Sequence, residues 1–141
     1  MKTKFKNILI GIAFLLSAFI FAEQTSKKVY VVPIQDVIDL GIPGLVSRAI
    51  DLAETNNASL IIFDIDTFGG RVDAATQIKD SISSTEIETV AFINRRAISA
   101  GSLISLSCDQ IYMTGCATIG ATSVVDMSGS KQSEKSQSYM R

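Results

Sequence analysis

The sequence predicts an α/β domain with a mostly parallel sheet. Four short runs of strand-forming residues alternate with three segments whose apolar side chains recur at helical spacing. Repeated β-α units of this length place helices against a parallel sheet. The two central runs, 59–65 and 89–93, are rich in apolar residues, as strands buried on both faces are.

The first three elements form one β-α-β unit. Residues 29–34 (VYVVPI) are mostly β-branched or aromatic, which predicts a strand. Residues 44–56 carry apolar side chains at helical spacing, and Asn56 and Asn57 end that pattern. Residues 59–65 (SLIIFDI) predict a second, buried strand.

The remaining elements repeat the pattern. Residues 72–82 place apolar side chains on one helical face, and residues 89–93 (TVAFI) predict a third strand. Residues 100–108 are small and apolar and suit a buried helix, before a short fourth strand at 110–113. Turns are expected at the two glycines that follow, Gly115 and Gly120.

The first 22 residues are typical of a secretory signal peptide. A basic start precedes an apolar run over residues 8–21 and a small residue, Ala22. That run is shorter than the roughly 20 residues of a spanning helix, and an uncleaved N-terminal membrane anchor is the alternative. Either segment predicts an exported, membrane-associated or extracytoplasmic protein. Residues 23–141 then form one domain.

The last residues predict a loop and an incomplete element. From Ser128 the composition changes to Ser, Gly, Lys and Gln, and Ser133 is placed to cap a further helix. The chain stops at Arg141 without a helix stop signal. We expect the domain to be truncated at its C-terminus.

Composition excludes several classes of function. The chain has no histidine, so neither a Ser-His-Asp triad nor a histidine-ligated zinc site can form. Net charge is -1 without a basic patch, which argues against nucleic acid as a partner. Acidic residues show no metal-binding pattern, and dinucleotide and phosphate-loop motifs are missing. We expect no metal or cofactor, and a nucleophilic serine would need lysine as its base.

Two cysteines, Cys108 and Cys116, are the only thiols. Export would allow them to form a disulfide. Their small and apolar neighbours favour two buried, unpaired thiols instead.

A double glycine follows the second predicted strand, in residues 66–70 (DTFGG). Open parallel sheets build their sites at this end of the strands. Two glycines leave backbone N–H groups uncovered, and these could stabilise an oxyanion. An ordinary strand-to-helix turn is the alternative.

A serine follows the third predicted strand in the same way. Ser99 precedes Ala100 and Gly101 at the start of a buried helix. Small neighbours would let a substrate carbonyl approach the hydroxyl, and the N–H of Ala100 could donate to an oxyanion. A helix N-cap is the alternative role for Ser99.

Together these motifs resemble the ClpP-like N-terminal domain of the NfeD family of membrane-bound serine proteases. The resemblance covers nearly all of residues 29–141, through VYVVPI, IIFDIDTFGGRVDAA, VAFINRRAISAGSLISLSCDQIYM, CATIGATSVV and SEKSQSYMR. It implies a ClpP/crotonase-like fold with Ser99 as the nucleophile. It also implies an oxyanion hole made by Gly69, Gly70 and Ala100.

The resemblance further implies a lysine base just before Tyr139. Lys135 lies four residues before this tyrosine and Lys131 eight, and each spacing matches one branch of the family. The residues around Lys135 match better. Phe68 departs from the family, which usually has proline there. The missing continuation of the domain puts the activity of this chain by itself in doubt, because little structure remains to bury the lysine.

The leading hypothesis is a serine endopeptidase with a Ser-Lys dyad. The resemblance implies that it cleaves hydrophobic segments of membrane proteins, such as partners of stomatin type, and that it assembles as a homo-oligomer. One alternative is a non-catalytic, membrane-associated interaction domain in which Ser99 is only a cap. Others are a protease of the signal peptide peptidase A type and a crotonase-type acyl-CoA enzyme, and the latter fits export poorly.

Overall fold

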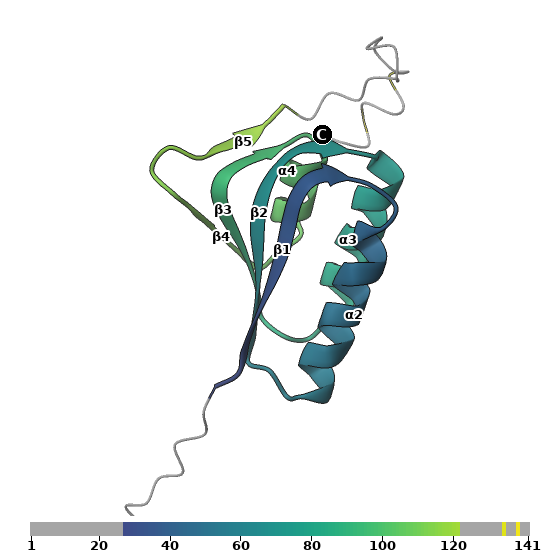
Figure 1. Cartoon of the computed structure of the whole chain (residues 1–141), viewed down its shortest axis with the longest axis vertical. Coiled ribbons are helices and arrows are strands. Elements are labelled where there is room, and N and C mark those ends of the chain that lie inside the picture. Colours follow the sequence, from purple (N-terminus) through teal and green to yellow (C-terminus); the bar gives the residue numbers. More distant parts are fainter. Residues whose placement is uncertain (1–26, 122–133, 135–137, 139–141) are drawn as a thin grey trace, which may run out of the picture.

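Strands and helices alternate along the chain as predicted (Figure 1). The computed structural model describes residues 27–121, together with Glu134 and Ser138. The elements are β1 (Val29–Ile38), α2 (Ile42–Thr55), β2 (Leu60–Gly70), α3 (Val72–Ser84), β3 (Thr89–Ile98), α4 (Ala100–Leu106), β4 (Gln110–Met113) and β5 (Thr118–Gly120). The predicted signal segment at 1–22 lies outside the described residues. So do Lys131, Lys135 and most of the predicted last helix.

All strand pairs in the sheet are parallel. The order is β1-β2-β3-β4, and β5 also pairs with β3, beyond the point where β4 ends. Pro33 lies in β1, an edge strand, where a missing N–H donor is tolerated. The predicted fold class, a parallel α/β sheet, is confirmed.

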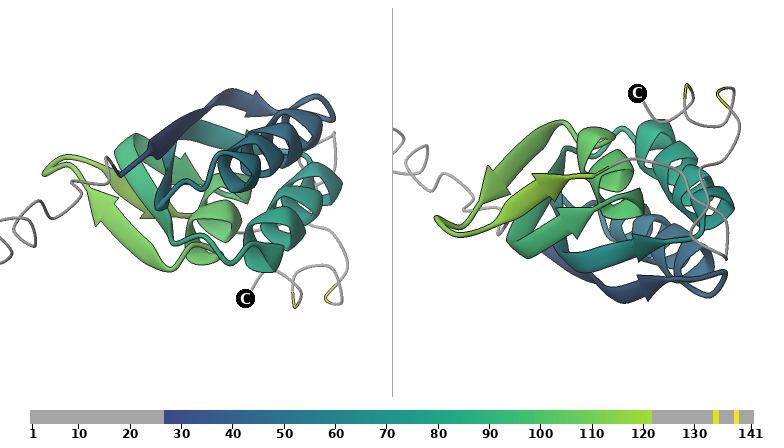
Figure 2. Two further views of the ribbon diagram at one scale, coloured as in Figure 1. Left: turned by 90° about the horizontal axis from the view of Figure 1, so that it is seen from below. Right: turned by 90° about the horizontal axis from the view of Figure 1, so that it is seen from above.

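The helices cover one face of this sheet (Figures 1 and 2). Side chains alternate along β2, so Ile61, Phe63 and Ile65 are fully buried while Ile62 and Asp64 are only half-buried. The buried set packs with apolar residues of all three helices in one core. The helix-covered face therefore supplies the core, and it fixes where the strand ends lie.

Three strands run further than the sequence predicts. β1, β2 and β3 were expected to end at residues 34, 65 and 93, but they continue to Ile38, Gly70 and Ile98. Except for Thr67, the polar residues in these extensions are at least partly exposed. β5 was missed altogether, and Gly120, expected in a turn, ends this strand. Consequently both chemical motifs lie within or directly after a strand rather than in loops.

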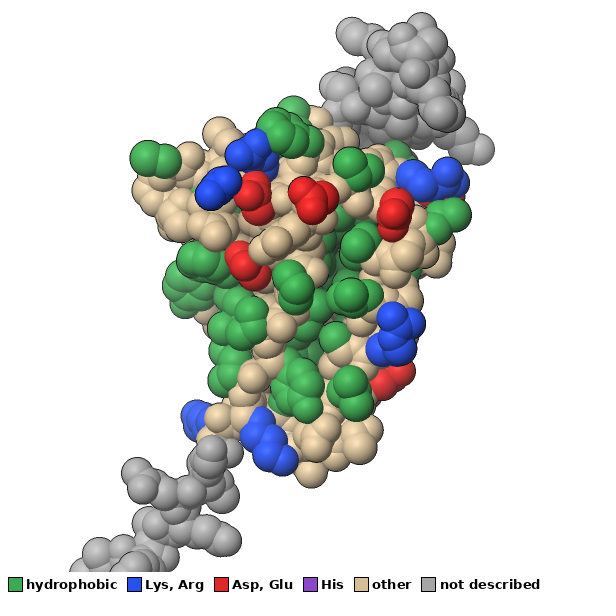
Figure 3. Space-filling model, in the orientation of Figure 1, with side chains coloured by type: hydrophobic (Ala, Val, Ile, Leu, Met, Phe, Trp, Pro, Cys, Tyr) green, Lys and Arg blue, Asp and Glu red, His purple; other side chains and the backbone are tan. Residues whose placement is uncertain are grey.

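The other face of the sheet carries exposed apolar side chains (Figure 3). A shallow hollow of about 660 Å³ lies there. It is lined by Val31, Leu60, Ile62, Asp64, Glu88, Val90, Phe92, Gln110 and Tyr112. Tyr112 is 56% exposed and Val31 is 63% exposed. An apolar patch of this kind favours association with another surface.

We predict that this face makes the chain self-associate. Tyr112→Lys should lower the solution mass measured by light scattering, because it places a charge on the patch. Leu52→Lys is the matched control, since Leu52 is 55% exposed but lies on α2. Equal masses for the wild type and the Tyr112 variant would contradict the prediction.

Candidate active site

Ser99 lies between β3 and α4 in a strained backbone conformation. Its φ is 54° and its ψ is -114°, a region that non-glycine residues rarely adopt. Such strain costs of order 1–3 kcal/mol and is concentrated at functional sites. Ser99 occupies the N-cap position of α4, yet its side chain makes no capping hydrogen bond. A capping role therefore does not account for this serine.

Backbone hydrogen bonds hold the strained residue on both sides. The N–H of Ser99 donates to the carbonyl of Gly120 at 2.8 Å, which ties it to β5. The carbonyl of Ser99 accepts from the N–H groups of Ser102 at 3.0 Å and Leu103 at 3.4 Å. The hydroxyl of Ser99 takes no part in these bonds and does not cap the helix.

The double-glycine turn lies directly against Ser99. The last paired residues of β2 and β3 are Thr67 and Ala97, and Gly69 and Ser99 each follow two residues later. A Cβ added to Gly69 would stand 2.8 Å from the Ser99 Cβ and 3.2 Å from the Ala100 nitrogen. The φ of Gly69, 105°, also favours glycine. Any side chain here would fill the space beside the serine.

The three predicted donors differ in their surroundings. The N–H of Gly69 already donates to Thr67 Oγ1 at 2.9 Å. The next residue but one, Arg71, donates its N–H to Ile38 on β1 at 2.8 Å. Because N–H groups alternate along a strand, the N–H of Gly70 faces away from β1. Ala100, the first residue of α4, has an N–H without an acceptor inside the helix.

The hydroxyl of Thr67 links the glycine turn to β1 by hydrogen bonds. Thr67 is 1% exposed, and its hydroxyl donates to the carbonyl of Asp36 while accepting from Gly69. Asp36 lies at an irregularity in β1, with a φ of 61°. The sequence analysis did not identify Thr67 as a residue of the site.

An aromatic and charged cluster lies next to the glycine turn. Phe68 is 72% exposed, and the guanidinium of Arg96 stacks over its ring at 4.3 Å. Arg96 Nε is 3.1 Å from Asp66 Oδ1, and Arg95 Nε is 3.9 Å from Asp66 Oδ2. The arginines were not predicted as site residues. Had the predicted third strand been extended beyond residue 93, the alternation of side chains along neighbouring strands could have placed Arg96 beside Phe68.

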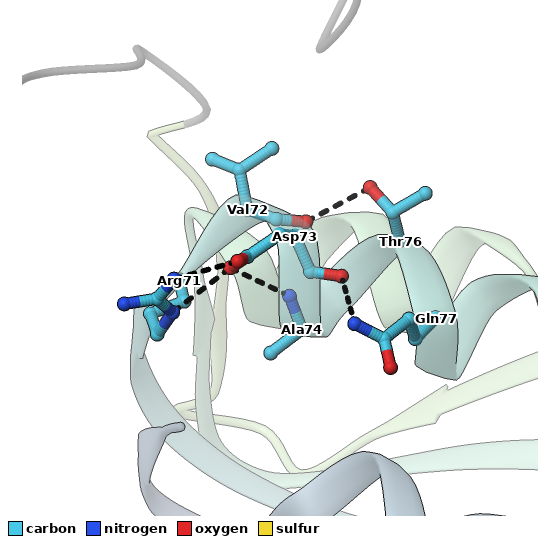
Figure 4. A network of polar contacts seen from close by, with 6 residues as sticks. All are labelled: Arg71, Val72, Asp73, Ala74, Thr76 and Gln77. Atoms are coloured by element: carbon cyan, nitrogen blue, oxygen red, sulfur yellow. Dashed lines mark hydrogen bonds and ion pairs between the residues drawn. The ribbon is translucent and has the colours of Figure 1, made fainter. Parts of the chain in front are cut away.

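An ion pair between Arg71 and Asp73 lies where the chain passes from the glycine turn into α3 (Figure 4). Arg71 donates to both carboxylate oxygens of Asp73, at 2.9 and 2.6 Å. Asp73 also accepts the N–H of Ala74 at 2.9 Å. The hydrogen bond from Arg71 lowers the pKa of Asp73 below its ordinary value.

Neither cysteine forms a disulfide, as the favoured prediction held. Cys108 is half-buried, and burial raises the pKa of its thiol to about 12. Cys116 is exposed, so the prediction that both are buried is wrong for this residue. Cys116 follows a turn after β4, where no helix covers the chain. Cys108, protonated at neutral pH, is no nucleophile.

No group of three or more metal-binding side chains forms in the part of the chain that the structure describes. Within those residues no helix has both the length and the apolar character to cross a membrane.

The fold and this serine turn define a ClpP-like protein. A solved 1510-N membrane-bound stomatin-specific protease, a serine-to-alanine variant, superposes with a TM-score of 0.72 and 30% identity. The match covers 80% of this chain and 58% of the solved chain. A lysine-to-alanine variant of that protease, in complex with a substrate peptide, gives a TM-score of 0.75 and 29% identity. That match covers 82% of this chain and 56% of the solved chain. ClpP1 of Listeria monocytogenes gives a TM-score of 0.54 and 27% identity, and the match covers 55% of this chain and 46% of the solved chain.

The chain belongs to the NfeD1b family, whose N-terminal domain matches residues 28–141. It is 38% identical to membrane protein NfeD1b of Bacillus subtilis (strain 168) over 137 residues. It is 35% identical to membrane-bound protease PH1510 of Pyrococcus horikoshii over 120 residues. These matches cover 95% and 82% of this chain but only 31% and 27% of the relatives. The chain thus spans about a third of their length.

We predict selective alkylation of the cysteines at neutral pH. Iodoacetamide should modify Cys116 rapidly, whereas Cys108 should react slowly because its raised pKa leaves little thiolate. Peptide mass spectrometry would measure both rates, and the unfolded chain, in which both thiols react, is the control. Equal rates in the folded chain would contradict the burial of Cys108.

Proposed function

We propose that this chain carries the nucleophile of a serine endopeptidase with a Ser-Lys dyad. The observation that carries the proposal is the strained Ser99, uncapped and in contact with Gly69. A serine whose hydroxyl is not used by the helix is free to attack a carbonyl. The chain contains no histidine, so the base must be another residue. The solved relatives with a replaced serine and a replaced lysine support that pair of residue types.

The proposed mechanism uses two proton transfers in each of its two stages, acylation and deacylation. A neutral lysine, Lys135 or Lys131, takes the proton of Ser99 while Oγ attacks the scissile carbonyl. The tetrahedral oxyanion accepts hydrogen bonds from the N–H groups of Gly70 and Ala100. The lysine returns its proton to the leaving amine, which completes the acyl-enzyme. The same lysine then takes a proton from the water that attacks the acyl carbonyl and gives it to Ser99 Oγ as the ester bond breaks, which releases the acid product.

Gly69 has a different part in this proposal. Its N–H is engaged by Thr67 Oγ1, so the donors we favour among the three predicted are those of Gly70 and Ala100. Gly69 contributes by lacking a side chain, which leaves room for the carbonyl beside Ser99.

The substrates we propose are hydrophobic segments of membrane-associated proteins. The similar 1510-N protease is described as stomatin-specific and was solved with a substrate peptide. Exposed Phe68, one residue before the glycine turn, suits an apolar peptide side chain. Homo-oligomeric assembly and export through the secretory route belong to the same proposal.

A non-catalytic interaction domain is the second candidate, favoured by the exposed apolar sheet face. A fluorophosphonate separates the two candidates, because it labels only an activated serine. A protease of the signal peptide peptidase A type would also be labelled, but the match to the NfeD1b family model favours the NfeD type.

We predict that Ser99→Ala abolishes cleavage and labelling without unfolding the domain. The test uses a completed protein, in which Arg141 is joined to the part of the 1510-N domain beyond the match. Loss of a nucleophile costs on the order of 10⁶ in kcat, so activity should fall to background while circular dichroism is unchanged. Ser107→Ala, at the other end of α4, is the control and should retain activity. Near-normal cleavage by the Ser99 variant would refute the mechanism.

We predict that Lys135→Ala inactivates the completed protein and that Lys131→Ala has a milder effect. Activity of the wild type should rise with pH through the pKa of the base, because only the neutral amine accepts a proton. The measurement is kcat/KM against pH for the wild type and both variants. An inactive Lys131 variant would reverse the assignment, and two active variants would refute the dyad.

A further inference from the structure

Ser102, three residues after Ser99, has a buried hydroxyl that joins three elements around the serine turn. It is 1% exposed and lies in the first turn of α4. Its Oγ is 2.7 Å from the carbonyl of Ala97 on β3 and 2.8 Å from the carbonyl of Gly120 on β5. The N–H of Gly120 donates to the same Oγ at 2.9 Å.

The two carbonyls compete for the single proton of the Ser102 hydroxyl. A serine has one proton to donate and two lone pairs to accept with. The proton serves the carbonyl of Ala97 or of Gly120, and a lone pair takes the N–H of Gly120. One side chain thereby satisfies polar groups on both sides of the serine turn.

Gly120 is also the residue that holds Ser99. Its carbonyl accepts the N–H of Ser99 at 2.8 Å. β5 is only three residues long and ends at Gly120, whose φ is 138°. So short a strand has few bonds of its own, and its last residue depends on the hydroxyl of Ser102.

We propose that Ser102 is a positioning residue for the nucleophile. Its hydroxyl anchors Gly120, and Gly120 in turn holds Ser99 in its strained conformation. Ser102 acts through Gly120 and does not touch the substrate. The positioning contact stands by itself, whereas its catalytic consequence rests on the proposed protease function.

The helix contains a matched control one turn further on. Ser105 is also buried, at 0% exposure, and its hydroxyl donates to the carbonyl of Gly101 at 2.8 Å. That bond lies within α4 and does not reach β5. Ser102→Ala and Ser105→Ala therefore each remove one buried hydroxyl from the same helix, and only the first removes the link to Gly120.

The first test measures amide hydrogen exchange in the full chain. Ser102→Ala should speed exchange at Ser99 and Gly120 by about fivefold or more, the size expected for losing one hydrogen bond. Ser105→Ala should leave these two amides unchanged. Equal exchange at Ser99 in the wild type and the Ser102 variant would overturn the proposal. Acceleration spread evenly over β3 and α4 would overturn it too, because Ser102 would then be a general stabilising residue.

The second test measures catalysis in the completed protein. Ser102→Ala should lower kcat by about tenfold or more, the effect of a misplaced reacting group, with KM within twofold. Ser102→Thr keeps the hydroxyl and should recover most of kcat, and Ser105→Ala should stay within twofold of the wild type. A raised KM with unchanged kcat would overturn the proposal.

A substitution at Gly120 tests the same contact from the other strand. A Cβ on Gly120 would meet nothing within 4 Å, but its φ disfavours a side chain. Gly120→Ala should therefore lower kcat, and its combination with Ser102→Ala should be less than additive. Gly115→Ala is the control, because its Cβ is equally free and its φ is not positive. Additive effects would overturn the coupling between Ser102 and Gly120. A folded wild type that fluorophosphonate does not label would refute the protease function, but the exchange test of the Ser102 contact would still apply.

Discussion

The contact between Gly69 and Ser99 is the constraint on which the rest of the site depends. Parallel pairing of β2 with β3 ends at Thr67 and Ala97, so the two motifs start level at the same edge of the sheet. Two backbones can then approach closely only if one lacks a side chain. The core that keeps β2 and β3 in register therefore also sets the distance between Ser99 and the glycine turn.

Each side of this contact is held by one small buried hydroxyl residue. Thr67 bonds the backbone of Gly69 and Asp36, and Ser102 bonds that of Ala97 and Gly120. Both are 1% exposed. Irregular backbone leaves N–H and C=O groups without regular partners, and a short hydroxyl side chain can satisfy them without filling the space that a substrate needs.

The sequence predicted the order of elements, because apolar periodicity follows directly from which faces are buried. It also predicted that the double glycine and Ser99 lie at neighbouring strand ends, because both follow buried strands of one parallel sheet. It could not predict the full lengths of β2 and β3. Their last residues include Asp66, Arg95 and Arg96, whose partly exposed polar side chains interrupt the apolar pattern of a buried strand. β5 and the role of Ser102 were missed because three residues carry no periodicity and a buried serine in a helix has no distinctive spacing.

The pairing of β5 with β3 has a consequence for the order in which the molecule is made. Ser99 leaves the ribosome before Gly120, which supplies the acceptor for its N–H. Until Gly120 has been added and β5 has docked, nothing on that side holds the strained backbone of the serine. A nascent chain that ends between these two residues would contain Ser99 but lack the bond that holds its backbone. The proposed protease would thus stay inactive until β5 has docked.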